Sequence, residues 1–183
     1  MSGDLRELRG DPFGLLAELD RRLRAIRQEG ASGEAEWEGL GVRVGSLWCA
    51  LPRADVREVV TPPPLTRVPG ARPWLIGLAN VRGKLLPVFD LAVLAGLPAE
   101  EDTRRARVLV FNSDQLPAGF LVGEVVGHRQ FAVEDQAPHR LQILSGSDFS
   151  NWLLGAFERD AKVWQVLSLH RLVASEQFVR TAE

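Results

Sequence analysis

Short runs of hydrophobic residues alternate with Gly, Pro and charged residues along most of the chain. Leu40, Val42 and Val44 alternate with small or charged residues, which is the period of a half-buried strand. A Gly-Ser turn and the apolar run 47–51 then predict the returning strand. Further strand-like runs occur at 56–60, 74–78, 85–91, 108–111, 120–122, 125–126, 150–157 and 163–167. Many short strands at this spacing indicate a β-barrel or a β-sandwich.

Longer stretches with helical periodicity are found at the two ends of the chain. Asp11-Pro12 is a helix start, and an amphipathic helix is predicted after it, with an apolar face of Leu15, Leu16, Leu19, Leu23 and Ile26. This face either packs on the chain's own core or docks on a partner. At the other end, Ser168 is expected to cap a helix from Leu169 to about Phe178. Its expected buried face comprises Leu169, Leu172, Val173 and Val179.

Three segments between the periodic runs are expected to be largely irregular. Residues 29–36 are polar and contain Gly, which is typical of a flexible linker. The acidic and basic charges of residues 99–107 largely cancel, so this loop is expected to be solvated, and residues 128–142 are expected to be rich in loops. The chain therefore divides into an N-terminal helix and linker (1–36), a β domain (37–179) and a tail (180–183).

The stretch 73–91, PWLIGLANVRGKLLPVFDL, predicts the most specific local structure. Its two apolar runs flank a short segment that contains Gly, which is the pattern of a β-hairpin. Gly83 suits a turn position with positive φ, which Arg82 would adopt only at a cost. Pro87 cannot donate a hydrogen bond, so its strand is expected to be an edge strand or to carry a bulge. Arg82 is then either a long cation presented at the hairpin tip or a solvated turn residue.

The composition is that of an ordinary soluble protein, since 45% of the 183 residues are hydrophobic and 25% are charged. The net charge of −2 argues against a protein built mainly to hold nucleic acid or anionic lipid. No run of about 20 apolar residues could span a membrane, and the charged N-terminus lacks the apolar centre of a secretory signal. Cys49 is the only cysteine, so no intramolecular disulfide can form. We therefore expect a cytoplasmic protein without direct membrane insertion.

No set of residues for catalysis or metal binding can be assembled from the sequence. His128, His139 and His170 are scattered and lack the spacing of a metal site. Cys49 lies in an apolar strand beside Trp48, which favours an inert buried thiol over a nucleophile. We predict no enzymatic activity, no metal and no cofactor. Two alternatives stay open: an enzyme that uses Cys49, and a small β-barrel that binds nucleic acid through an aromatic face.

Four short motifs occur in a fixed order along the β domain. They are ADVREVV at 54–60, TRVP at 66–69, the 73–91 hairpin with its N-V-R-G centre, and GFLVGEV at 119–125. This ordered set resembles the signature of the CheW family, the scaffold proteins of bacterial chemosensory arrays. The family usually has Asp where this chain has Gly123. The resemblance covers nearly all of the chain after the linker.

The resemblance implies a mainly β fold of two SH3-like five-stranded barrels that share a hydrophobic core, with a C-terminal helix and, here, an added N-terminal helix. It implies a non-enzymatic scaffold that joins the regulatory domain of a CheA-type histidine kinase to the cytoplasmic tip of a methyl-accepting chemoreceptor. In the family, the receptor hairpin lies in the groove between the two barrels, and the kinase domain packs on the end of one barrel. The protein would therefore act at membrane-associated arrays through receptor binding, without nucleic acid.

The candidate partner-binding residues are Arg82, Asn80, Gly83, Glu58, Val59 and Trp74. By the resemblance, the first three correspond to the N-x-R-G tip of the family, whose Arg is associated with receptor and kinase coupling. Glu58 and Val59 correspond to the E-V pair of the family. Trp74 is added from its own chemistry, because a partly exposed Trp is enriched at binding hot spots.

Within the family, members from type IV pilus systems, which control twitching motility, look most similar. The similarity lies in the extra N-terminal helix and in the two ends of the β domain, W-E-G-L-G-V-R-V and V-W-Q-V-L-S-L-H-R-L. An adaptor of flagellar chemotaxis is the alternative.

Overall fold

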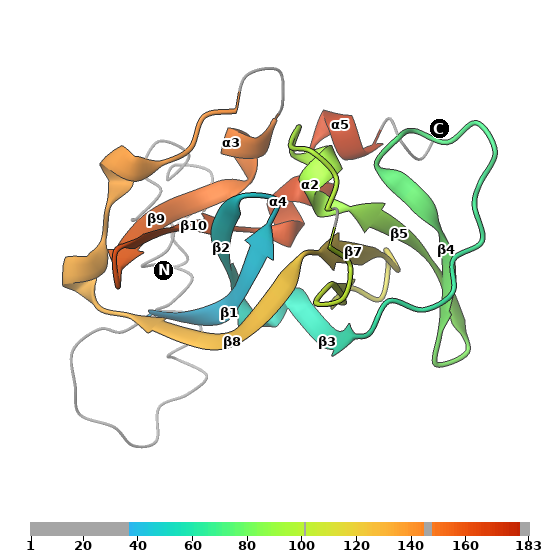
Figure 1. Ribbon diagram of the computed structural model, residues 1–183, viewed down its shortest axis with the longest axis horizontal. Coiled ribbons are helices and arrows are strands. Elements are labelled where there is room, and N and C mark those ends of the chain that lie inside the picture. Colours follow the sequence, from blue (N-terminus) through green and yellow to red (C-terminus); the bar gives the residue numbers. More distant parts are fainter. Residues whose placement is uncertain (1–36, 101, 145–147, 180–183) are drawn as a thin grey trace, which may run out of the picture.

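The computed structural model describes residues 37–100, 102–144 and 148–179. The predicted N-terminal helix and linker, and the predicted tail, lie outside these residues. Within the described part of the chain, ten strands form two five-stranded sheets. Each sheet forms one lobe, and the two lobes lie side by side in Figure 1. The predicted mainly β fold with two five-stranded lobes is confirmed.

The first lobe holds the sheet with the strand order β8-β1-β2-β10-β9, and the second lobe holds the sheet β3-β6-β7-β5-β4. The strands of the first lobe are β1 (Trp37–Val44), β2 (Leu47–Pro52), β8 (Glu124–Phe131), β9 (Leu153–Arg159) and β10 (Lys162–Leu167). Those of the second lobe are β3 (Val56–Val60), β4 (Leu75–Val81), β5 (Lys84–Asp90), β6 (Arg107–Phe111) and β7 (Gly119–Val122). The helices are α2 (Leu91–Leu94), α3 (Phe149–Trp152), α4 (Leu169–Val173) and α5 (Glu176–Val179). Short 3-10 turns are η1 (Arg53–Asp55), η2 (Val133–Asp135) and η3 (Pro138–Arg140).

The strands of the two lobes are joined by two direct connections. The chain enters the second lobe through η1, which joins β2 to β3, and returns through Gly123, the single residue between β7 and β8. Asp55 of η1 is only 4% exposed and accepts a hydrogen bond from the backbone N–H of Leu169 at 2.8 Å. The first connection is therefore tied to the beginning of α4, which lies near the boundary between the lobes (Figure 1).

A hydrophobic core that both lobes share explains why the two sheets form one unit. Buried side chains from both sheets meet there, among them Leu51 of β2, Leu109 of β6 and Phe120 of β7. Alternate residues of the same strands point the other way: Ala50 faces a cluster inside the first lobe, and Val110 faces one inside the second. Burying one such Phe or Leu stabilises the fold by about 1.5–3 kcal/mol. The predicted shared core is confirmed.

The turn of the β4–β5 hairpin differs from the prediction at one residue. Both central residues, Arg82 with φ 51° and Gly83 with φ 80°, have positive φ. A two-residue turn that matches the twist of its strands requires this at both positions. The Asn80 Oδ1 accepts a hydrogen bond from the Gly83 N–H at 2.9 Å, which stabilises the turn. The left-handed backbone of Arg82, a conformation that we expected Arg82 to avoid, therefore destabilises the fold by about 1–2 kcal/mol.

Pro87 lies neither on an edge strand nor at a bulge of its own strand, contrary to the prediction. Its strand β5 lies between β4 and β7, and the irregularity of the β4–β5 pair is in β4. Leu78, the partner of Pro87, uses its own N–H and C=O to bond Thr66. The nitrogen of Pro87 therefore points away from β4. Because β7 begins opposite Val88, the missing donor disrupts no ladder bond there.

The predictions for residues 128–157 were partly right. The segment 128–142, expected to be rich in loops, begins with the end of β8, where Phe131 pairs with Trp37, and then consists of the short turns η2 and η3 and irregular residues. The expected strand 150–157 begins instead as the helical turn α3. This turn brings Phe149 and Trp152 into the shared core, where both are fully buried, so tertiary packing outweighs the local strand pattern.

The predicted C-terminal helix is two short helices, α4 and α5. Ser168 caps the first as predicted, since its Oγ accepts a hydrogen bond from the Arg171 N–H at 3.3 Å. Ser175 ends it by donating from its own Oγ to the Leu172 carbonyl at 2.6 Å. The change of direction puts Phe178 in the shared core and leaves Val179 52% exposed, so the expectation that Val179 is buried was wrong.

The charged segment 99–107 is not simply a solvated loop. The side chain of Glu100 is only 12% exposed and forms an ion pair with Arg43 of β1. Glu100 was expected to be surface charge because the acidic and basic residues of the loop balance. The structure shows that one of its charges is paired across the molecule, with a strand of the other lobe.

Candidate functional site

A groove lies where the edge of the second-lobe sheet meets the first lobe. It has a volume of about 230 Å³ and is lined by Leu40, Arg53, Val56, Arg57, Glu58, Val59 and His128. β3 is an end strand of its sheet and β8 is an end strand of the other, and residues of both strands line this space. We call this space the interlobe groove. Val59 is 39% exposed here, which gives the groove an accessible apolar side chain.

Glu58 connects the interlobe groove to the tip of the β4–β5 hairpin. Its Oε2 lies 2.7 Å from the Nε of Arg82. The contact is an ion pair by distance, although its angles are not those of a hydrogen bond. The Glu58 side chain is 22% exposed and that of Arg82 is 79% exposed, so a partly buried carboxylate positions a cation that remains open to solvent. Two motifs that the sequence separates are therefore brought together.

The contact between Glu58 and Arg82 also helps to close the second lobe. β3 and β4 are the two end strands of its sheet, so no strand ladder joins them. The segment after β3 covers the free edge of β4 through a bridge between Thr66 and Leu78. The ion pair adds a second link at the hairpin tip. Arg82 therefore has a structural partner as well as an exposed face.

The two arginines that line the groove differ in how their charges are compensated. Arg57 Nη2 forms an ion pair with Asp114 at 2.7 Å. Arg53 Nη1 instead lies 2.8 Å from the Nε2 of His128. A guanidinium only donates hydrogen bonds, so the Nε2 of His128 is the acceptor in this contact. The charge of Arg53 therefore has no carboxylate partner in the described residues around the groove.

The other predicted residues are placed differently. Asn80 and Gly83 belong to the hairpin turn, and an added Cβ on Gly83 would meet no heavy atom within 4 Å. Gly83 is thus required for its backbone conformation and not for space. Trp74 packs against the shared core with partial exposure, and its carbonyl accepts a hydrogen bond from the Asp90 N–H at 2.7 Å. It does not line the interlobe groove.

Sequence reasoning did not single out Leu40, Arg53 or His128 as site residues. Arg53 precedes the motif at 54–60, and its short distance from the motif was the only available signal. Leu40 and His128 lie opposite each other in the β1–β8 ladder. No local pattern predicts that pairing, because it depends on a register between distant strands.

Cys49 is fully buried in the shared core. Burial raises the pKa of its thiol to about 12, so the thiolate needed for a nucleophile does not form at neutral pH. The geometry therefore gives no support to an enzyme that uses Cys49. In the described ranges, no group of three His, Cys, Asp or Glu side chains could hold a metal ion, and no helix is long and apolar enough to cross a membrane.

Comparison with known proteins identifies the class. The CheW-like domain family matches residues 38–177, so this chain belongs to the CheW-like family. Among individual proteins, it is 34% identical over 175 residues to Protein PilI of Pseudomonas aeruginosa, a match covering 93% of this chain and 96% of PilI. It is 26% identical over 140 residues to Chemotaxis protein CheW of Helicobacter pylori, covering 75% of this chain and 81% of that protein.

A solved structure shares the fold. The crystal structure of the scaffolding protein TtCheW from Thermoanaerobacter tengcongensis matches with a TM-score of 0.68 and 20% sequence identity, covering 82% of this chain and 96% of that chain. The family and the CheW-like fold expected from the four ordered motifs are both confirmed.

Proposed function

We propose that this protein is a non-enzymatic, cytoplasmic scaffold that couples a methyl-accepting chemoreceptor to a CheA-type histidine kinase in the control of type IV pilus twitching motility. The observation that carries the proposal is the Arg82–Glu58 ion pair. It holds the hairpin-tip cation beside the interlobe groove. By the resemblance, Arg82 corresponds to the family Arg associated with receptor and kinase coupling, and Glu58 corresponds to the E of the family's E-V pair. Membership of the CheW-like family supports the general class of function.

The interlobe groove suits side chains from one face of a receptor helix. Leu40, Val56 and Val59 supply apolar surface, and charged side chains surround it. Arg53 and the exposed face of Arg82 are cationic. A matching helix therefore presents apolar residues to the groove and acidic residues to these two arginines.

The outer face of the second lobe suits the kinase regulatory domain. Leu85, next to the hairpin turn, is 64% exposed, and Leu65 and Val68 are 36% and 37% exposed. Apolar side chains as open as Leu85 are a common feature of protein–protein contacts. Leu85 lies on the same hairpin as Arg82, and Leu65 and Val68 lie in the connection between β3 and β4, so receptor and kinase would bind next to each other.

Similarity to PilI supports the pilus pathway over the flagellar one. PilI is 34% identical to this chain in a match that covers 93% of this chain. The Helicobacter pylori CheW is 26% identical in a match that covers 75% of this chain. The longer match is consistent with an added N-terminal segment of residues 1–36, followed by the CheW-like domain at 37–179 and the tail at 180–183. We propose that this N-terminal segment is specific to the pilus-type scaffold.

The proposal is tested by measuring binding to receptor-tip fragments and kinase regulatory domains encoded in the same genome. Wild type, Arg82→Ala and Lys84→Ala are compared, because Lys84 is an exposed cation two residues away and serves as the matched control. Losing an Arg at a desolvated contact costs about 2–4 kcal/mol, equivalent to about 30- to 1,000-fold in affinity. We expect this loss for Arg82→Ala with a pilus-type partner and little change for Lys84→Ala.

Other outcomes separate the alternatives. Tighter binding to flagellar than to pilus-type partners would assign the protein to the flagellar chemotaxis pathway. Binding that ignores Arg82→Ala would keep the scaffold function and reduce Arg82 to a turn residue. No binding to any receptor tip or kinase would reject the scaffold function, and binding to single-stranded nucleic acid at low salt would then be measured.

A further inference from the structure

The second connection between the lobes is a single residue without a side chain, Gly123. Its N–H donates to the Arg43 carbonyl at 2.9 Å. An added Cβ at this position would collide with the Glu100 carboxylate and would lie 2.7 Å from Arg43 Nη2. The backbone of Gly123 is outside the left-handed region, and the atoms that an added Cβ would meet are the ends of the Glu100 and Arg43 side chains, so a larger residue here would displace those side chains.

An ion pair fills the space beside Gly123. Arg43 Nη1 lies 2.8 Å from Glu100 Oε2, with side chains that are 25% and 12% exposed. Arg43 belongs to β1 of the first lobe, whereas Glu100 belongs to the α2–β6 connection of the second. The Glu100 Oε2 is shielded from solvent and has no hydrogen bond of good geometry among the described residues, so its charge depends on Arg43.

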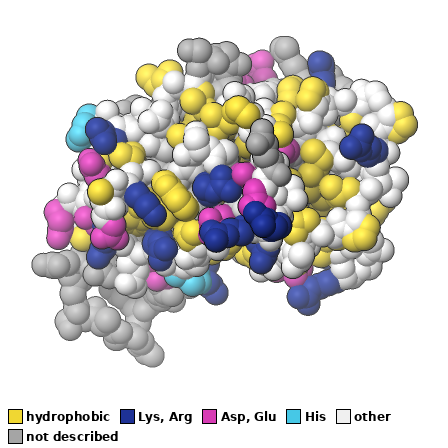
Figure 2. Space-filling model, in the orientation of Figure 1, with side chains coloured by type: hydrophobic (Ala, Val, Ile, Leu, Met, Phe, Trp, Pro, Cys, Tyr) yellow, Lys and Arg dark blue, Asp and Glu magenta, His cyan; other side chains and the backbone are white. Residues whose placement is uncertain are grey.

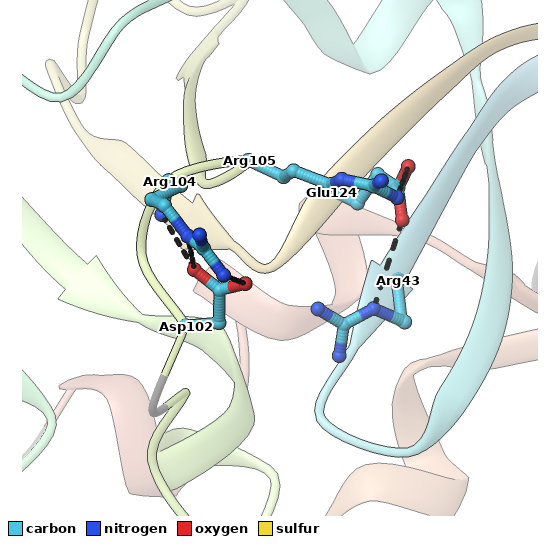
Figure 3. A pocket seen from close by; sticks show the side chains of 5 residues that line it. All are labelled: Arg43, Asp102, Arg104, Arg105 and Glu124. Carbon is cyan, nitrogen blue, oxygen red and sulfur yellow. Dashed lines mark hydrogen bonds and ion pairs between the residues drawn. The ribbon is translucent and has the colours of Figure 1, made fainter.

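A second ion pair crosses the same boundary, with its arginine in the second lobe and its carboxylate in the first. Arg105, from the α2–β6 connection, lies with its Nη1 3.2 Å from the Oε1 of Glu124 in β8 of the first lobe. Arg43 Nε lies 3.9 Å from the other oxygen of Glu124. Figure 3 shows that Arg43 and Arg105 approach Glu124 from different sides, while Arg104 turns back to Asp102 of its own loop. Each lobe therefore contributes one arginine and one carboxylate.

Apolar packing supports the same junction. The turn between β1 and β2 begins at Gly45, whose carbonyl accepts a hydrogen bond from Arg43 Nη1 at 2.7 Å. An added Cβ on Gly45 would lie 3.1 Å from Leu97 and 3.7 Å from Ala92. The first-lobe turn thus packs directly on α2 and the residue that precedes the charged loop.

The hollow at this junction does not suit a bound anion. It has a volume of about 410 Å³ and is lined by Arg43, Asp102, Arg104, Arg105 and Glu124. Each of its three arginines already pairs with a carboxylate. Figure 2 shows basic and acidic side chains mixed near the middle of this face, over the boundary between the lobes. The arrangement is that of internal charge pairing and not of an open anion site.

We propose that two ion pairs act as an electrostatic latch: Glu100 and Arg105, paired with Arg43 and Glu124, fix the position of the two lobes across the Gly123 connection. By fixing the lobes, the latch sets the width of the interlobe groove. This last consequence rests on the proposed function, whereas the latch itself does not. Glu100 is therefore a positioning residue, not a partner-binding one.

Interlobe distance is measured on the isolated full-length protein by electron spin resonance. Spin labels are attached at Val133→Cys in the first lobe and Leu85→Cys in the second, both at exposed positions, while the buried Cys49 stays unlabelled. In the Glu100→Gln background we expect a shifted or broader distance distribution. Asp102→Asn is the control, because Asp102 pairs with Arg104 within the same exposed loop and crosses no boundary. An unchanged distribution in Glu100→Gln would overturn the latch.

Hydrogen exchange and a rescue variant provide a second test. In Glu100→Gln, amides of 43–47, 99–100 and 102–106 should exchange about tenfold faster than in wild type and Asp102→Asn. Gly123→Asp should destabilise the wild-type background, where Glu100 fills the space. In the Glu100→Ala background it should restore slow exchange, because its carboxylate takes the vacated place beside Arg43. Equal tolerance of Gly123→Asp in both backgrounds would contradict the proposal.

The two proposals can fail separately. A protein whose lobes loosen in Glu100→Gln but which binds no receptor tip has the latch without the proposed function. A protein that binds receptor tips through Arg82, with lobes unaffected by Glu100→Gln, has the function without the latch.

Discussion

Arg82 at the tip of the β4–β5 hairpin reaches Glu58 of β3, with 2.7 Å between Nε and Oε2. Glu58 lies on one end strand of the sheet, and Arg82 lies in the turn that follows the other end strand, β4. Arg82 holds this position with a left-handed backbone, φ 51°, which an arginine adopts at a cost of about 1–2 kcal/mol. Strain at an exposed side chain with a dedicated partner is typical of a functional position.

The first prediction separates the backbone of Arg82 from its side chain. The free energy of unfolding of Arg82→Gly should be about 1 kcal/mol higher than that of Arg82→Ala, because Gly removes the left-handed strain and Ala does not. Loss of the ion pair contributes little to stability in either variant, since the Arg82 side chain is 79% exposed. Both variants should bind partners equally poorly. Chemical denaturation and binding measurements test this, and equal stability of the two variants would argue against a strained turn.

A second prediction concerns the pH dependence of stability through Asp90. This residue is 6% exposed and caps α2, accepting from the N–H groups of Ala92 and Val93. Burial raises its pKa, the two N–H groups lower it, and nearby Glu100 raises it, with a net upward shift. The folded state thus takes up the proton more readily than the unfolded state.

The sign of the effect follows from that shift. Stability from a raised pKa is fully present below about pH 3.9, the ordinary Asp value, and is lost as the pH rises through the folded pKa. Wild type should therefore gain stability relative to Asp90→Asn as the pH falls from 7 toward about 4. Thermal unfolding of both proteins across this range measures the difference. A constant difference, or one that grows with pH, would contradict the shift.

Features set by neighbouring residues could be predicted from the sequence. The alternation of β1, the returning strand β2 and the 73–91 hairpin depend on period-2 patterns and turn chemistry, and all three are present. Arg82 and Glu58 were each found through separate motifs. That they contact each other depends on how the second-lobe sheet closes, which neither motif encodes.

Features set by distant partners could not be predicted. Phe149 and Trp152 form a helical turn because the shared core binds their side chains, although the local pattern is that of a strand. Glu100 was assigned to a solvated loop because Arg43, its partner, lies on a strand of the other lobe. His128 enters the groove only through the β1–β8 register.

The third prediction concerns Cys49. Burial raises the pKa of its thiol to about 12 and removes it from solvent, so native protein should react negligibly with thiol reagents at neutral pH. Labelling should follow the unfolding transition in denaturant. Cys49→Ala should leave partner binding unchanged, although the lost sulfur atom will lower stability slightly. Rapid labelling of the folded protein would reopen the possibility of a reactive thiol.

The last prediction tests whether the shared core makes the two lobes unfold together. Phe120 of β7 is fully buried against Phe89, Phe111 and Phe178, so Phe120→Ala should cost about 3–5 kcal/mol. Although this change is in the second lobe, tryptophan fluorescence, which reports mainly on the first, should shift to lower denaturant by the same amount as circular dichroism. Val110→Ala, inside the second lobe alone, is the matched control for a purely local effect. If Phe120→Ala separated the two transitions, the lobes would be independent folding units and the shared core a contact surface between them.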